Sequence, residues 1–400
     1  MNLIAVNTST LRLGHPLPFA LRNQQGVLLA NKGYTIHRQE EITYWTSRGI
    51  TLCVDVDAAN NHRAYVGKLY EMVRADISLG HIADMQLAAS DLKAVAADET
   101  TGIPDWTALQ IRANSLLRDP QGEHFLPRLD KLYSELHHLV QHHPDATLCA
   151  LMHLSATELH MYSATHAMLV YVVCSLTARD VLNWPPEQDA ALGKAALTMN
   201  IGMTALQDEL TVKNQALTAW QIDHVEQHAQ RAYQMLVAMG VDNQDWLQAV
   251  RHHHDRTPGP LADKTVAMQL ARLLQRADTF TARLSPRAGR LPMPFNAAMR
   301  ACYFDEKQQV DSAGAALIKA MGVYSPGMYV RLANGEVAMV IRRGANTTAP
   351  RVAVIVNRSG MPMGEMIVRE THTPTTKIIA YVAHREVKVQ VQLEKLLALV

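Results

Sequence analysis

The stretch IDHVEQHAQRAYQML at residues 222–236 shows the pattern that decides the fold class of this chain. Its apolar side chains recur at steps of three and four residues: Ile222, Val225, Ala229, Ala232, Tyr233 and Leu236. That spacing places them on one face of an α-helix, so the stretch predicts an amphipathic helix. The same periodicity runs from about residue 145 to residue 321, and prolines divide this block into several helices. We therefore expect a mainly α protein built around a helical bundle.

Outside the block the periodicity changes to that of β-strands. Before it, residues 11–36 and 50–56 contain short alternating runs with turn residues between them, which predict a small β-rich unit. After it, residues 328–343 contain Asn334-Gly335 between two alternating runs, a strong hairpin signal. Two further runs and a terminal helix at 390–399 complete what we interpret as a small, β-barrel-like C-terminal subdomain.

These changes predict four consecutive parts. They are a β-rich domain at 1–60, a helical connector at 61–145, a helical domain at 146–320, and a β-rich subdomain with a terminal helix at 321–400.

Composition excludes several classes of protein. Of 400 residues, 48% are hydrophobic and 19% charged, which is typical of globular proteins and not of disordered chains. Lys and Arg total 38 against 37 Asp and Glu, so the net charge of +1 argues against a nucleic-acid polymer as partner. The most apolar run, at 167–176, is about half the length of a membrane-spanning helix, so we expect no membrane span. Four scattered cysteines and no signal-peptide pattern favour the cytoplasm.

The helical block carries a set of potential metal ligands. His166, His228, Asp278 and the run His252-His253-His254 all lie within helical patterns, and helical bundles commonly build metal sites in their cores. Adjacent helical residues point about 100° apart, so at most two of the three consecutive histidines can face one pocket. Each histidine alone is more typical of a surface or satisfied core position, and the run of three is compatible with a solvated helix end.

The set resembles the HD-GYP domain, the cyclic di-GMP phosphodiesterase branch of the HD metal-dependent phosphohydrolases. Six segments carry the resemblance in order: YSATHA (162–167), LTMNIGMTAL (197–206), HAQRA (228–232), VRHHHDR (250–256), RADTFTARLSPRAGR (276–290) and MGVYSPGMYVRLANGEVAMV (321–340). It covers roughly residues 150–370 and implies an HD-type helical bundle. The resemblance places His166, His228, His253, His254 and Asp278 at the family's metal-ligand positions.

The departures from the family pattern concern its chemistry. Met199-Asn200 stands where the family has His-Asp, and Met203 where it has Lys. The loop at 257–260 is short and lacks the family's Tyr. Gly289 stands where a second Tyr of the family pattern would be. A neutral Asn cannot replace an anionic ligand that bridges two cations, and a Met thioether is a poor ligand for Fe or Mn. Because two-metal hydrolysis needs both cations, the resemblance implies no complete catalytic set.

We therefore expect a bacterial signalling protein with a degenerate HD-GYP domain, which binds a protein partner or cyclic di-GMP without turnover. An active or weakly active metal-dependent phosphodiesterase is the alternative, and a scaffold without metal or nucleotide is a third. We expect either no metal or a single weakly bound Zn, Fe or Mn at His228, His253 and His254. Arg287, Arg290 and Arg256 are candidate phosphate ligands, although a solvated loop would also explain the first two.

Overall fold

The computed structural model describes most of the chain from residue 105 onward and short pieces before it. The described residues are 3–5, 13–14, 17, 20–23, 28–30, 34–38, 52–55, 105–120, 124–157, 159, 161–344 and 346–400. The chain divides into two compact units, Met1–Ala108 and Leu109–Val400, which are treated separately. Residues 61–104 of the predicted connector lie outside the described part, so its N-terminal boundary stays a prediction.

The first unit contains the predicted small β-rich element. Its strands pair antiparallel in the order β1 (Leu3–Ala5), β4 (Cys53–Asp55), β2 (Leu21–Arg22) and β3 (Leu28–Ala30). Leu21 and Leu52 are buried, which gives the sheet an apolar face.

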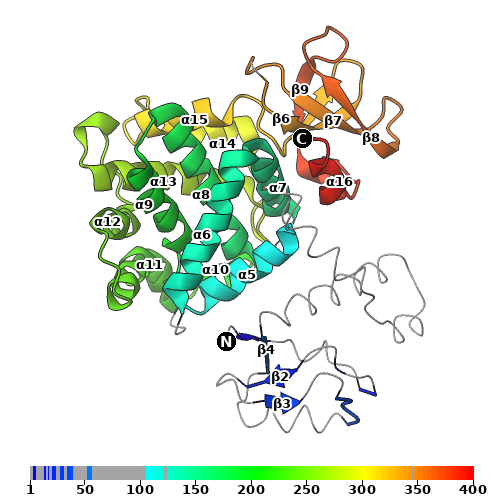
Figure 1. The fold of residues 1–400 in the computed structure, drawn as a ribbon. Helices are drawn as coiled ribbons and strands as arrows, with labels where there is room; N and C mark the ends of the chain where they lie inside the picture. Colours follow the sequence, from blue (N-terminus) through cyan, green and yellow to red (C-terminus); the bar gives the residue numbers. More distant parts are fainter. Residues whose placement is uncertain are drawn as a thin grey trace. The chain divides into compact units, whose positions relative to one another are not determined.

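The second unit is mainly a bundle of helices (Figure 1), as the 3.6-residue periodicity predicts. The helices are α5 (Trp106–Arg118), α6 (Phe125–His142), α7 (Pro144–Thr157), α8 (Tyr162–Thr177), α9 (Pro186–Thr198), α10 (Thr204–Val212), α11 (Ala219–Ala238), α12 (Gln244–His252), α13 (Val266–Leu284), α14 (Phe295–Tyr303) and α15 (Ser312–Met321). A π-helical turn, η2 (Ala178–Leu182), extends α8, and a 3₁₀ turn, η3 (Leu261–Asp263), precedes α13.

Helix α8 is the centre of this bundle. Every one of its residues is buried, and α7, α9, α13 and α15 all pack against it. A helix that is apolar all round must be covered on every side, which explains why its hydrophobic run is a core element. None of the helices in the described part of the chain is long and apolar enough to cross a membrane.

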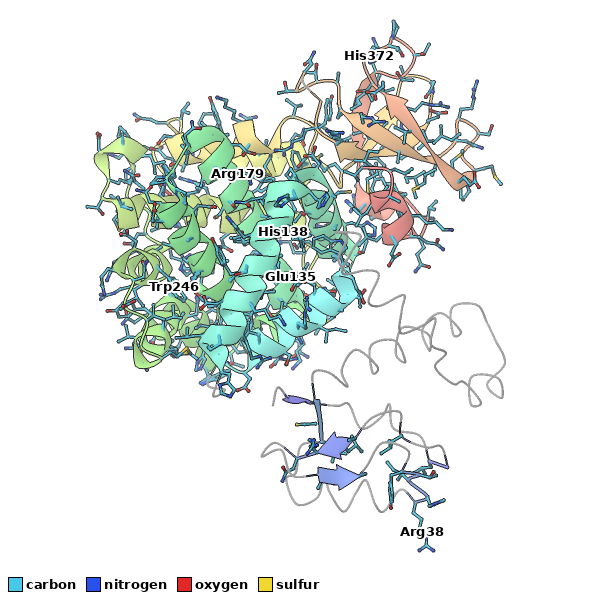
Figure 2. All side chains as sticks on the ribbon, in the orientation of Figure 1. Arg38, Glu135, His138, Arg179, Trp246 and His372 are labelled. Carbon is cyan, nitrogen blue, oxygen red and sulfur yellow. The ribbon has the colours of Figure 1, made fainter. Side chains whose placement is uncertain are left out.

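Helices α5 and α6 also contact the bundle. Arg112 on α5 forms an ion pair with Glu135 on α6 at 2.6 Å, and α6 packs against α7, α8 and α9 (Figure 2). The part of the predicted connector from residue 109 to 145 thus lies within the second compact unit.

The C-terminal part is a five-stranded antiparallel sheet in the order β8-β7-β6-β5-β9. The strands are β5 (Tyr329–Leu332), β6 (Val337–Arg342), β7 (Arg351–Val356), β8 (Pro362–Glu370) and β9 (Ile378–Val382). The predicted hairpin at Asn334-Gly335 joins β5 to β6, and Gly335 has a φ of 89°, which glycine adopts at little cost. A 3₁₀ turn, η4 (His384–Glu386), and a helix α16 (Leu393–Leu397), shorter than predicted, follow.

The sheet is held against the bundle at two points. Arg343, just after β6, forms an ion pair with Asp145 on α7 at 2.5 Å and donates to the Ala320 carbonyl. Gly327, with a φ of 89°, packs so closely on α7 that a Cβ there would lie 2.6 Å from the Cβ of Met152. The turn that opens the sheet therefore requires glycine for both conformation and space.

Candidate metal and ligand site

Three neighbouring helices and one turn supply the predicted metal-ligand residues. His166 lies on α8, His228 on α11 and Asp278 on α13, whereas His253 and His254 follow the end of α12. Helix α12 packs against α9, α11 and α13. Its Asn243 side chain caps the first turn, and the indole of Trp246 donates to Thr198 at the end of α9, 2.9 Å away (Figure 2 labels Trp246). The start of α12 is thus fixed against the end of α9, just before the turn that begins at Met199.

The structure brings His228, His253 and His254 into one cluster, called here the three-His cluster. The Nε2 atom of His228 lies 3.2 Å from that of His253 and 3.1 Å from that of His254. One ligand atom from each of the three lies within 4.8 Å of the others. His228 and His253 are buried, and His254 is exposed, so the cluster opens to solvent on one side.

Backbone carbonyls set the tautomers of the two buried rings. The Nδ1 atom of His228 lies 2.5 Å from the Val225 carbonyl oxygen, and that of His253 lies 2.6 Å from the Val250 oxygen. A carbonyl only accepts, so Nδ1 must carry the hydrogen and, in a neutral ring, Nε2 keeps a lone pair.

Burial lowers the pKa of His228 to about 4 and that of His253 to about 3, so both rings are neutral near pH 7. Two Nε2 lone pairs therefore face each other with no proton between them. A cation satisfies this arrangement, and Nδ1–H to carbonyl contacts are typical of metal-bound histidines.

His252 lies outside the cluster. Its Nδ1 atom is 2.7 Å from an Asp255 carboxylate oxygen, and its Nε2 is 3.1 Å from the Gln248 side chain. The helical argument that at most two of the three consecutive histidines share a pocket agrees with this placement.

His166 and Asp278 form a separate pair. The His166 Nε2 atom lies 2.8 Å from Oδ1 of Asp278, and its Nδ1 lies 3.4 Å from the Thr281 hydroxyl. Burial acts to raise the pKa of the Asp278 carboxyl, but the hydrogen bond and charge of His166 outweigh it, and the pKa lies well below its usual range. The ionised carboxylate is close enough to act electrostatically on His228 and His253.

The turn that contains Met199 and Asn200 touches the backbone of α11 at His228. A Cβ on Gly202 would lie 2.7 Å from the carbonyl oxygen of His228, so this turn and α11 touch backbone to backbone. Met199 is fully buried and Asn200 is nearly so. This turn therefore carries a thioether in the core and a neutral amide, with no carboxylate at either position. Met203, at the start of α10, adds no positive charge.

This donor set fits one cation and not two. Three imidazoles with an open side match a tetrahedral site with a fourth position for water or ligand. A second cation would need an anionic oxygen shared with the first, and Asn200 cannot supply that charge. His228, His253 and His254 are thus the residues that would hold an ion, which would there polarise a phosphate oxygen.

The three predicted phosphate ligands lie in different surroundings. Arg287 donates to the Tyr162 hydroxyl at 3.1 Å and lies over its ring, which in turn stacks on His166. Arg290 donates to the Ala282 carbonyl. Arg256 lines a cavity of about 530 Å³, and Arg287 and Arg290 are not among the residues that line it.

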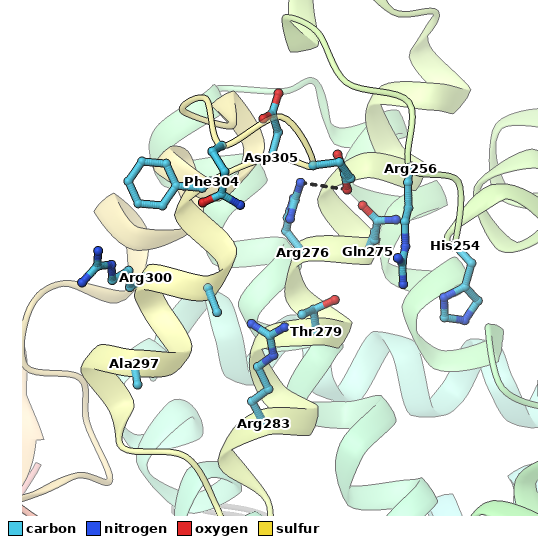
Figure 3. Close-up of a pocket in the computed structure, with 13 residues that line it drawn as sticks. His254, Arg256, Gln275, Arg276, Thr279, Arg283, Ala297, Arg300, Phe304 and Asp305 are labelled. Atoms are coloured by element: carbon cyan, nitrogen blue, oxygen red, sulfur yellow. Dashed lines mark hydrogen bonds and ion pairs between the residues drawn. The ribbon is translucent and has the colours of Figure 1, made fainter.

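The cavity contains arginines that the sequence interpretation missed. Arg276 and Arg283 from α13 and Arg300 from α14 line it together with Arg256, next to His254 (Figure 3). A usable signal was present: Arg276, Thr279 and Arg283 follow steps of three and four, which places them on one helix face.

Comparison with known proteins shows what the helical unit is similar to. Residues 150–314 match the model of the HD domain family. The match begins within α7 and ends within α15, and it contains the three-His cluster, His166 and Asp278.

Two known proteins resemble the chain. The cyclic di-GMP phosphodiesterase PA4108 of Pseudomonas aeruginosa is 28% identical over 249 residues, which are 59% of this chain and 58% of that protein. The match thus spans little more than half the length of the relative. The solved structure of Bd1817, an HDG"Y"P protein from Bdellovibrio bacteriovorus, aligns with a TM-score of 0.45 and 14% identity, over 80% of this chain and 99% of that one.

Proposed function

We propose that this HD domain is a signalling module that binds cyclic di-GMP without hydrolysing it, and that it holds at most one divalent cation. The observation that carries the proposal is the turn with neutral Met199 and Asn200, which touches the His228 backbone at Gly202. The ligand is suggested by the similarity to the phosphodiesterase PA4108.

The loss of hydrolysis follows from charge. In-line cleavage of a phosphodiester by two metals requires neutralisation of both the attacking and the leaving oxygen. The three-His cluster supplies imidazole donors that carry no negative charge, and the Asp278 carboxylate is bonded to His166. Positive charge for a phosphate must therefore come from a single cation and from arginines such as Arg287 and Arg290.

Binding of a phosphate ligand does not require the metal-activated water that hydrolysis requires. Guanidinium groups bind phosphate oxygens through paired hydrogen bonds, and this needs no activated water. Because the family's Lys and Tyr are absent, we expect an affinity no tighter than micromolar. A base–aromatic contact is worth about 1–3 kcal/mol, and the residues that would provide it here are gone.

The decisive experiment combines a turnover assay with calorimetry. The purified full chain is incubated with cyclic di-GMP and Mn²⁺ or Fe²⁺, and linear dinucleotide and GMP are quantified. We expect no product above background, together with measurable binding of the intact ligand. His252→Ala is the matched control for His253→Ala, since the two residues are adjacent and only His253 belongs to the three-His cluster. Rapid hydrolysis abolished by His253→Ala and retained in His252→Ala would refute the proposal.

A second candidate is a weakly active phosphohydrolase. It is favoured by the retained three-His cluster and by the ionised Asp278, which together keep four of the family's ligand positions. The turnover assay separates the two: no product from the unmodified chain supports the binding proposal, and a low rate that His253→Ala abolishes supports the hydrolase. Met199→His with Asn200→Asp is not expected to create activity by itself, because Met203 and the short 257–260 loop remain.

A further protein partner would be consistent with the signalling role that we propose. Exposed apolar side chains gather around the start of α11, at Val212, Leu217, Trp220 and Ile222. We assign them no ligand.

A further inference from the structure

We propose that the cavity between α13, α14 and the 304–308 loop is a second binding site, which takes a phosphomonoester. It shares only His254 with the three-His cluster, and it does not depend on the binding of cyclic di-GMP proposed above. Its volume of about 530 Å³ lies within the usual range for small-molecule sites.

Positive charge is the first observation. Arg256, Arg276, Arg283 and Arg300 line the cavity, against the carboxylates of Asp305 and Glu306. Figure 3 shows the guanidinium groups of Arg256, Arg276 and Arg283 directed toward its interior, from α13 and from the loop after α12. Arg300 lies at the rim on α14.

Both carboxylates are already engaged. Asp305 accepts hydrogen bonds from the backbone N–H groups of Lys307 and Gln309, each at 2.8 Å. Glu306 forms ion pairs with Arg272 and Arg276. They therefore do not neutralise Arg256 or Arg283, and within the described residues neither of these arginines forms an ion pair.

Unsatisfied donors are the second observation. The side chain of Arg276 is only 7% exposed, and its Nε atom is buried without a hydrogen-bond partner among the described residues. The Nη1 atom of Arg283 is likewise buried and unpaired in that part of the chain. A buried guanidinium N–H without an acceptor is costly, and an anion in the cavity would satisfy both groups.

The chemistry favours a phosphomonoester over a diester. A monoester carries a charge of about −1.5 to −2 at pH 7 and three strong acceptor oxygens, whereas a diester carries one charge. Three guanidinium groups and the hydroxyl of Thr279 surround the cavity and can donate to a compact dianion. Phe304 at the wall provides an apolar surface for the organic part of the ligand.

Calorimetric titration of the full chain with GMP tests the proposal, with inorganic phosphate and cyclic di-GMP as comparison probes. We expect GMP to bind more tightly than either, and Arg283→Gln to weaken it by at least about tenfold. Arg385→Gln, an exposed arginine outside the cavity, is the matched control and should have no effect. Exposed Arg256→Gln gives a second variant whose folding is not at risk, and it should also weaken GMP binding.

Three results would overturn the proposal. The first is GMP binding that neither Arg283→Gln nor Arg256→Gln changes, and the second is the absence of GMP binding. The third is equal affinity for GMP and inorganic phosphate, which would make the cavity a site for free phosphate. His228→Ala separates this site from the three-His cluster, since it should leave GMP binding intact even if cyclic di-GMP binding is lost or never existed.

Discussion

At the scale of single residues, the chemistry of the site depends on which atoms carry hydrogen. His228 and His253 use Nδ1–H on backbone carbonyls and leave Nε2 free, whereas His166 uses Nε2 on Asp278. The same residue type therefore serves as a potential metal ligand in one place and as a carboxylate partner in another. Sequence spacing cannot separate these roles, because they depend on the nearest carbonyl or carboxylate in space.

The three-His cluster predicts the metal stoichiometry. Protein loaded with excess Zn²⁺ or Mn²⁺ and then desalted should retain no more than one equivalent per chain, because three imidazoles and no bridging carboxylate fit one ion. Elemental analysis provides the measurement. His253→Ala should remove the bound ion, and His252→Ala should not. Two or more equivalents in the unmodified protein would contradict the site as described.

His384 predicts a pH dependence of stability. Burial lowers the pKa of His384 to about 4. The rings of His153 and Tyr329 face it, and burial also lowers the pKa of His153. Below the ordinary value of about 6.5 the unfolded chain binds a proton that the folded chain does not. The free energy of unfolding should therefore fall between pH 6.5 and pH 4, by at most about 3 kcal/mol from this residue.

Urea unfolding between pH 4 and pH 7.5 tests this pH dependence. His384→Gln should flatten the slope below pH 6.5 relative to the unmodified protein. The exposed His142→Gln serves as control and should leave the slope unchanged. Identical slopes in all three proteins would show that His384 is protonated equally in the folded and unfolded chains.

At the scale of elements, the contact between the 199–203 turn and α11 fixes the cluster. Gly202→Ala would place a Cβ against the His228 carbonyl, an atom that cannot move without moving α11. We expect this one methyl group to lower cation affinity by at least about tenfold, because metal ligands must be held within fractions of an ångström. Isothermal titration with Zn²⁺ measures the effect. Gly364→Ala, where a Cβ meets open space and φ is not positive, is a control for folding outside the site.

A second element-scale prediction concerns the buried ion pairs between α13 and α15. Asp311 accepts from Arg272 at 2.6 Å and Arg276 at 3.2 Å, and its other oxygen caps α15 at Gly314. Asp311→Ala would leave two buried guanidinium groups short of an acceptor, at a cost of about 3–5 kcal/mol. Glu306→Gln, at a more exposed carboxylate, should cost less. Chemical denaturation of the two variants checks the order, and a reversed order would contradict it.

At the scale of the whole molecule, periodicity predicted the elements and the ordered motifs predicted the family. The buried run at 167–176 became the central helix, and Asn334-Gly335 became the hairpin of the C-terminal sheet. The cavity arginines were not predicted, because Arg276 and Arg283 line a cavity only together with α14 and the 304–308 loop, which are distant in sequence. The domain boundaries, the phosphate ligands and the metal content stay predictions.

In the three-His cluster the Nε2 atoms of His228 and His253 face each other at 3.2 Å without a proton between them. This arrangement has a consequence for the folding of the chain. An ion that binds only the folded protein stabilises it in proportion to the logarithm of its concentration. Each tenfold rise in free cation above the dissociation constant should then add about 1.4 kcal/mol to the free energy of unfolding. The amount of folded protein in a cell would thus vary with the supply of a trace metal, even if that metal performs no reaction.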